Sequence, residues 1–226
     1  MTAPSLARPQ ALLFDLDGTL IDTAPDLARA TNALRDHHGL EALPFETIRP
    51  EVSNGGSALV TLALGLEQDH PEHASARAYL LDAYGQGVAI DSRVFNGLER
   101  LLEYWARPPR SWGIVTNKPR AYAAPLVDAL GLHPGVLLCA DDLPVRKPNP
   151  EPLWEAARRL DVAAQACWYI GDHIRDMQAA RAAGMRAIAV GYGYIDEDED
   201  RQSWNADQWF ERPSDLVVAL LEDETH

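Results

Sequence analysis

Residues 11–19 read Ala-Leu-Leu-Phe-Asp-Leu-Asp-Gly-Thr, and this stretch decides the fold and most of the chemistry. Its four leading apolar residues have a length typical of a buried strand. Two carboxylates, Asp15 and Asp17, follow one residue apart, and Gly18 and Thr19 then turn the chain. Because the carboxyl ends of strands face the ligand crevice of an open parallel sheet, we expect both acids there. The plain alternative is a strand followed by an Asp-Gly turn with solvated acids.

Asp15 and Asp17 are also suited to bind one Mg²⁺. This ion takes hard oxygen ligands, and a protein usually supplies one or two carboxylates while water and phosphate supply the rest. A side-chain oxygen of Asp15 and a backbone or side-chain oxygen of Asp17 would serve as ligands. A carboxylate held in this way can attack phosphorus and form an aspartyl-phosphate.

Three later apolar runs end in polar residues in the same way. Strand ends at one edge of a parallel sheet would bring a hydroxyl, a lysine and further carboxylates to Asp15 and Asp17. The residues that follow these runs are Thr116 and Asn117 after 112–115, Asp141, Asp142 and Lys147 after 136–140, and Gly171, Asp172 and Asp176 after 168–170.

In this order, the four segments resemble the motifs of the haloacid dehalogenase superfamily of phosphohydrolases, and the resemblance covers nearly the whole chain. It implies an α/β fold, with a Rossmann-like doubly wound parallel sheet core and an inserted α-helical cap domain. It also implies a Mg²⁺-dependent phosphoric monoester hydrolase that acts through an aspartyl-phosphate on a small phosphorylated metabolite.

The resemblance implies a role for each matching residue. Asp15 would be the nucleophile, and Asp17 would protonate the leaving alkoxide and then activate water. Thr116, beside Asn117 in its motif, would hydrogen-bond a phosphoryl oxygen, and Lys147 would balance the charge of Asp15 and the phosphate. Clustered carboxylates and a phosphate dianion repel one another unless cations neutralise them, which agrees with these roles. The expected metal ligands are Asp15, Asp17, Asp172 and Asp176, with orientation of Lys147 as the alternative role of the last.

His173 departs from the family pattern, in which small polar or acidic residues are commoner after the acid of this motif. Two interpretations stay open. The histidine is either a bystander beside the metal site or a group that touches phosphate and tunes the response to pH.

Residues 23–89 contain no strand-like run and interrupt the series of strands. Apolar residues at helical spacing predict four helices, around 27–38, 45–52, 58–63 and 76–84. We therefore expect a core of residues 1–22 and 90–226 and a helical cap of residues 23–89. Such a cap would close over the site, control access of water during the reaction, and determine the choice of substrate.

Residues 49–56 of the expected cap read Arg-Pro-Glu-Val-Ser-Asn-Gly-Gly. Adjacent glycines break a helical region and let backbone amides approach a ligand, and an arginine suits a carboxylate or a phosphate. We predict that Arg49, Ser53, Gly55 and Gly56 contact the substrate. The alternative is a turn between helices with a solvated arginine.

Three segments resemble one subfamily in particular: residues 22–26, residues 49–56 and the Tyr-Gly-Tyr-Ile loop at 192–195. Phosphatases of N-acetylmuramic acid 6-phosphate, which serve cell-wall recycling, share them and are close relatives of phosphoglycolate phosphatases. The resemblance favours the muramic substrate, with 2-phosphoglycolate or another sugar phosphate as the alternative. The glycines and tyrosines of the loop also fit a turn and packing role.

Composition restricts partners and location. The formal net charge of −14 argues against nucleic acid as a partner, and no apolar stretch is long enough to span a membrane. Cys139 and Cys167 fall in expected strands and indicate reduced, buried thiols. The first ten residues do not resemble a secretory signal, so the cytoplasm is the default expectation. The acidic runs at 196–200 and 222–224 are expected to be solvated, and the chain to be a monomer or homodimer.

Three other functions fit part of the pattern. A receiver-type signalling module also uses acids, a hydroxyl and a lysine, but it is roughly half this length and lacks a helical insertion after its first strand. A haloalkanoate dehalogenase attacks carbon and needs neither Mg²⁺ nor the second acid. A phosphomutase shares the aspartyl-phosphate, and the motifs do not separate it from a phosphatase.

Overall fold

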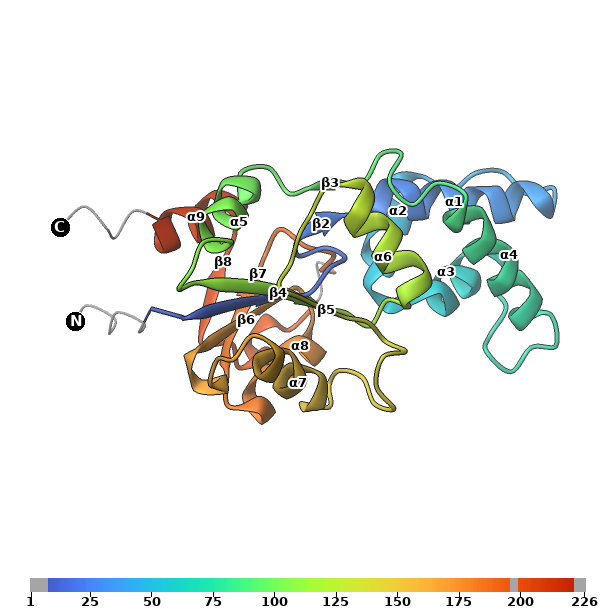
Figure 1. Ribbon diagram of the computed structural model, residues 1–226. Helices are drawn as coiled ribbons and strands as arrows, with labels where there is room; N and C mark the ends of the chain where they lie inside the picture. Colours follow the sequence, from blue (N-terminus) through green and yellow to red (C-terminus); the bar gives the residue numbers. More distant parts are fainter. Residues whose placement is uncertain (1–7, 196–198, 222–226) are drawn as a thin grey trace.

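The computed structural model describes residues 8–195 and 199–221, so the first seven residues and most of the two acidic runs lie outside it. Its main sheet has six parallel strands, and the strand that precedes Asp15 lies in the interior of the sheet (Figure 1). The strands, in spatial order, are β5 (Val136–Leu138), β4 (Ser111–Val115), β1 (Ala11–Phe14), β6 (Cys167–Gly171), β7 (Arg186–Val190) and β8 (Gln208–Phe210).

Helices cover both faces of this sheet, which confirms the expected doubly wound α/β fold. Successive side chains of β1 point to opposite faces of the sheet, and both faces are buried. Leu12 and Phe14 join the apolar cluster on one face, while Ala11 and Leu13 join the cluster on the other. In Figure 1, α5 and α9 lie above the sheet and α7 and α8 below it. The bounds are α5 (Leu98–Trp105), α6 (Arg120–Ala129), α7 (Glu151–Arg159), η2 (Ala164–Ala166), α8 (Ile174–Ala183), η3 (Arg201–Trp204) and α9 (Pro213–Leu221).

Three short strands were not predicted. β8 pairs in parallel with β7 and extends the sheet beyond what we expected to be its last strand. Its sequence, Gln-Trp-Phe, has no apolar run that would signal a strand. A separate antiparallel pair, β2 (Ile21–Asp22) and β3 (Arg93–Val94), joins the two points where the chain leaves and re-enters the core.

The insertion between β2 and β3 is helical, as its periodicity predicts. Its second expected helix divides into α2 and a 3₁₀ segment, η1, because Pro50 has no N–H for an α-helical bond. We use the word cap for residues 23–89; its division from the core stays a prediction. The elements are α1 (Ala24–His37), α2 (Phe45–Ile48), η1 (Arg49–Asn54), α3 (Gly55–Leu64) and α4 (His73–Gly85).

The helices of the insertion pack on one another and on the core. Leu34, Leu59 and Leu80 belong to the same buried apolar cluster as Phe14 of the sheet. Cys139 and Cys167 are both buried free thiols, as predicted. Among the described residues, no helix combines the length and the apolar character needed to cross a bilayer.

Candidate active site

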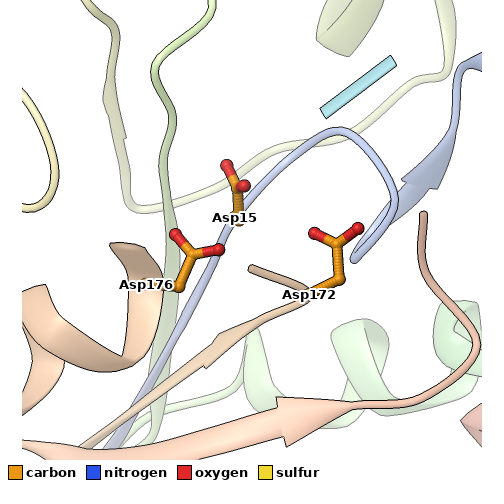
Figure 2. A group of neighbouring side chains, drawn as sticks. All are labelled: Asp15, Asp172 and Asp176. Atoms are coloured by element: carbon orange, nitrogen blue, oxygen red, sulfur yellow. The ribbon is translucent and has the colours of Figure 1, made fainter. Parts of the chain in front are cut away.

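Three buried carboxylates meet at the carboxyl ends of two neighbouring strands. Asp15 follows β1, Asp172 follows β6, and Asp176 lies in the first turn of α8 (Figure 2). One oxygen from each of these carboxylates lies within 4.8 Å of the others. The arrangement follows from topology, because β1 and β6 pair in register and end side by side. The three groups can therefore share one cation.

Lys147 supplies the positive charge closest to this cluster. Its Nζ lies 2.8 Å from Asp15 Oδ1 and 2.9 Å from Asp176 Oδ1, and it donates to the Tyr169 hydroxyl at 2.7 Å. Burial alone would lower the pKa of Lys147, but the two carboxylates raise it above its ordinary value. The lysine is therefore held as a cation between two acids.

Asn117 holds the segment that carries this lysine. Its side-chain amide donates to the Lys147 carbonyl at 2.9 Å and accepts from the Lys147 N–H at 3.1 Å. The end of β4 is thus fixed to the loop after β5. Asn117 is a positioning residue in this arrangement, in addition to its place in the cavity wall.

Asp17 points away from the three-carboxylate cluster. Its Oδ1 accepts from Thr23 Oγ1 at 2.6 Å and lies 2.9 Å from Lys118 Nζ. Burial lowers the pKa of Lys118, but Asp17 and then Tyr84 more than offset this and raise it. The sequence analysis missed Lys118, although it lies two residues after Thr116 in the same motif. Only the orientation of the Asp17 side chain identifies it.

The site carries more negative than positive charge. In the described part of the chain, the four acids Asp15, Asp17, Asp172 and Asp176 outnumber the cations beside them, which are Lys118, Lys147 and, near Asp176, Arg175. Burial, then the charges of Asp15 and Asp176, raises the pKa of Asp172 to about 7. This excess of negative charge favours binding of a cation, and the donor set is the hard oxygen type that Mg²⁺ prefers.

A cavity of 510 Å³ opens over Asp15, Asp17, Lys118 and Lys147. Its floor is formed by core residues that include Asp15, Asp17, Thr116 and Lys147. The opposite wall comes from the cap, through residues that include Ser53, Gly55, Gly56, Arg77 and Tyr84. Three of the four predicted substrate contacts therefore lie where the prediction needs them.

Arg49, the fourth, does not line the cavity. Its Nη1 donates to the Gly193 carbonyl and its Nη2 to the Tyr192 carbonyl, each at 3.0 Å, and its guanidinium lies over the Tyr194 ring. Main-chain carbonyls thus engage two of the five N–H donors of the guanidinium. Arg49 joins the cap to the loop after β7, and its contact with a substrate stays a prediction.

This loop, residues 191–195, also supports the acidic cluster. The Tyr194 N–H donates to Asp172 Oδ2 at 2.9 Å. The Tyr194 hydroxyl accepts from the N–H groups of Thr23 and Ala24, at 2.6 and 2.9 Å, and donates to Asp22. A Cβ on Gly193 would lie 2.2 Å from Asp172 Cβ, so only glycine allows this approach.

His173 caps α8. Its Nδ1 accepts from the Arg175 N–H, and its own N–H donates to Asp176 Oδ2, each at 3.1 Å. Burial and then Arg175 lower the pKa of His173 to about 4, so the ring is neutral near pH 7. The histidine does not line the cavity. This geometry favours a structural role beside the acids.

The chain is similar to known proteins over most of its length. Residues 12–190 match the family described as haloacid dehalogenase-like hydrolase. The chain is 40% identical to N-acetylmuramic acid 6-phosphate phosphatase of Pseudomonas aeruginosa over 94% of this chain and 95% of the relative. It is also 40% identical to phosphoglycolate phosphatase of Xanthomonas campestris pv. campestris, over 92% of this chain and 95% of the relative.

Solved structures share the fold. A crystal structure of a predicted phosphoglycolate phosphatase from Haemophilus somnus superposes with a TM-score of 0.80 at 24% identity, covering 94% of this chain and 98% of that chain. The structure of a hydrolase from Pseudomonas syringae gives 0.72 at 25% identity, covering 95% and 99%. The arrangement of sheet and inserted helices is therefore shared over nearly the full length.

Proposed function

This chain belongs to the haloacid dehalogenase-like hydrolase family and is a phosphoric monoester hydrolase, and on that premise we propose that it acts through a phosphorylated Asp15 with Mg²⁺. The observation that carries the proposal is the buried cluster itself. Asp15 combines an ammonium partner with two neighbouring carboxylates. A carboxylate nucleophile needs this setting to approach a phosphate dianion.

The residues present fit Mg²⁺. The carboxylates of Asp15 and Asp172 would bind it, with the backbone carbonyl of Asp17 as a third protein ligand, because the Asp17 side chain is occupied by Lys118 and Thr23. Asp176 is bonded to Lys147 and would act mainly on that lysine. When bound, Mg²⁺ would neutralise phosphate charge and polarise the phosphoryl group.

The residues at the floor account for both halves of the reaction. The first half of the reaction requires Asp17 in its protonated form, with its carboxyl turned from Lys118 toward the leaving group. A carboxylate oxygen of Asp15 then attacks phosphorus, the P–O bond to the alcohol breaks, and the alkoxide takes the proton of the Asp17 carboxyl. A water molecule then gives its proton to Asp17 and attacks the phosphorus of phospho-Asp15. The bond to Asp15 breaks, and inorganic phosphate leaves. Lys147 and the Thr116 hydroxyl stabilise the phosphoryl oxygens throughout.

The substrate that we propose is N-acetylmuramic acid 6-phosphate, with 2-phosphoglycolate as the alternative. Relatives named for both compounds are equally similar to this chain. The cavity supports the larger one, because 510 Å³ lies in the range of sites that enclose drug-sized molecules. The cap would close this space over the sugar and exclude water before Asp15 is phosphorylated.

Phosphate release tests the proposal directly. N-acetylmuramic acid 6-phosphate, 2-phosphoglycolate and p-nitrophenyl phosphate are compared with Mg²⁺, with EDTA, and with Ca²⁺ in its place. We expect activity only with Mg²⁺, and inhibition by Ca²⁺, whose larger and looser shell misplaces the nucleophile. Full activity in excess EDTA would reject the metal, and a clear preference for 2-phosphoglycolate would reject the muramic substrate.

A further inference from the structure

Two cations of the cavity, Arg77 and Arg146, have no bonded partner in the described part of the chain, and of these Arg146 is exposed whereas Arg77 is half-buried. Arg77 of α4 lines the cap wall and is half-buried. Within residues 8–195 and 199–221, no hydrogen bond or ion pair engages its guanidinium. Lys118 and Lys147 are bonded to carboxylates, and Arg175 donates to the Ser53 carbonyl. Arg77 therefore faces the cavity with its donors unused.

Arg77 lies beside Gly56 of α3. A Cβ added to Gly56 would lie 3.7 Å from Arg77 Nε and 3.4 Å from Leu81 Cδ2. The arginine thus lies alongside the start of α3, at the part of the wall where the main chain has no side chain. A ligand group at this wall would contact both the Arg77 guanidinium and the main chain at Gly56.

The charges around the cavity indicate which chemical group of a ligand would lie beside Arg77. The floor already provides Lys147 and the excess of acid that favours binding of a cation, so the reacting phosphate needs no cation from the cap. A half-buried guanidinium without a partner carries a desolvation cost that a bound anion offsets. The planar fork of arginine matches a carboxylate through two parallel hydrogen bonds. A second anion on the substrate, remote from the phosphate, fits the wall.

We propose that Arg77 is the specificity residue that binds the carboxylate of the substrate and so selects phosphate monoesters that carry a second, acidic group. This inference rests on the proposed function, because it takes the reacting phosphate to lie over Asp15. Arg77 acts on recognition, and the chemistry at the floor proceeds without it.

Two sugar phosphates that differ in one group provide the test. N-acetylmuramic acid 6-phosphate carries a lactyl carboxylate, and N-acetylglucosamine 6-phosphate lacks the lactyl ether and is otherwise the same. We expect Arg77→Met, which keeps the apolar stem, to lower kcat/KM for the muramic compound about 10- to 100-fold, the scale for hydrogen bonds to a charged group. The glucosamine compound should change less than about 2-fold, and Arg77→Lys should restore part of the loss.

Arg146 supplies the matched control. It lines the same cavity from the core side but is exposed, so Arg146→Met removes the same charge without removing the wall cation. We expect the ratio of the two substrates to stay unchanged in this variant. A selective loss in Arg146→Met, or an equal loss or no loss on both substrates in Arg77→Met, overturns the assignment.

Binding separates this inference from the proposed chemistry. In an Asp15→Asn background, calorimetry measures affinity for N-acetylmuramic acid 6-phosphate without turnover. Weaker binding on addition of Arg77→Met supports Arg77 even if the wild type releases no phosphate, in which case only the proposed reaction fails. If Arg77→Met unfolds at a lower temperature than the wild type, Arg77→Gln, which also removes the charge, replaces it in the same comparison. Equal affinity of Asp15→Asn and of the double variant Asp15→Asn/Arg77→Met would reject Arg77 as the carboxylate-binding residue and leave the aspartyl-phosphate mechanism intact.

Discussion

The cations at the floor of the cavity are paired with carboxylates, whereas Arg77 on the cap wall has no such partner among the described residues. At the floor, Lys118 and Lys147 each lie within 2.9 Å of a carboxylate before any ligand arrives. Asp15, Lys147 and Asp176 are preorganised, so these three groups need no rearrangement at the moment of reaction. The Arg77 guanidinium would find its partner in the ligand, as a residue that recognises a substrate does.

The largest expected effect lies at the floor. Asp15→Asn removes the nucleophile, and we expect kcat to fall roughly 10⁴- to 10⁶-fold, the scale for loss of a hydrolase nucleophile. Phosphate release under saturating Mg²⁺ measures it. Asp128→Asn, at an exposed position of α6, is the matched control and should leave kcat unchanged. Turnover near the wild-type rate in Asp15→Asn would falsify the covalent mechanism.

Lys147→Met tests whether the floor is held together by charge balance. The substitution leaves Asp15 and Asp176 buried without their cation, and we expect a loss of about 3–5 kcal/mol in the free energy of unfolding without Mg²⁺. Mg²⁺ should recover part of it by binding the folded state. Urea titrations with and without Mg²⁺ measure both effects.

Lys118→Met is the comparison variant for this experiment. Asp17 is more exposed than Asp15 and keeps its hydrogen bond from Thr23, so the loss should be smaller. Equal losses in the two lysine variants, or no gain from Mg²⁺ in Lys147→Met, would contradict the picture of a single cation site at Asp15.

Arg49→Ala sharpens the contrast with Arg77, since both arginines belong to the cap. Arg49 is bonded to the core loop, so its loss should weaken attachment of the cap whatever the substrate is. We expect kcat/KM to fall by a similar factor, about 10-fold, for substrates with and without a carboxylate. Steady-state kinetics on the same sugar pair measures it. A loss of kcat/KM confined to the sugar phosphate with a carboxylate would indicate that Arg49 contacts the substrate.

Tyr194→Phe tests a hydroxyl that joins the loop after β7 to the start of α1. The lost hydroxyl serves two amides at the start of α1 and the Asp22 carboxylate, which stay buried or partly buried. We expect a loss of about 1–3 kcal/mol in the free energy of unfolding. Tyr192→Phe, which removes one hydrogen bond to the Thr19 carbonyl, should cost less. If the two variants unfold at the same urea concentration, the hydroxyl of Tyr194 does not hold α1.

The sequence predicted the floor well because that information is local. Each of Asp15, Thr116 and Asp172 directly follows its strand, and parallel strands place their carboxyl ends at one edge. Knowing the strands was therefore enough to expect these groups together. The edge strand β8 escaped prediction because three residues, of which one is polar, carry no periodicity.

The wall was harder to predict because its geometry depends on how helices pack. Both Arg49 and Arg77 are arginines of the insertion, and nothing in their neighbouring residues says which one faces the cavity. The answer comes from η1 meeting the loop at 191–195 and from α4 packing beside α3. Lys118 was missed for a similar reason, since its importance follows from the rotamer of Asp17.

The interior position of β1 has a consequence for biosynthesis. Its pairing partners, β4 and β6, begin about 100 and 150 residues later in the chain. At a translation rate of about 5–20 residues per second, the ribosome exposes this apolar strand for roughly 10–30 s before β6 emerges. The intervening helices can pack among themselves during that interval, because their contacts are closer in sequence. We expect nascent chains that end before residue 167 to protect the inserted helices from protease and leave β1 available to chaperones.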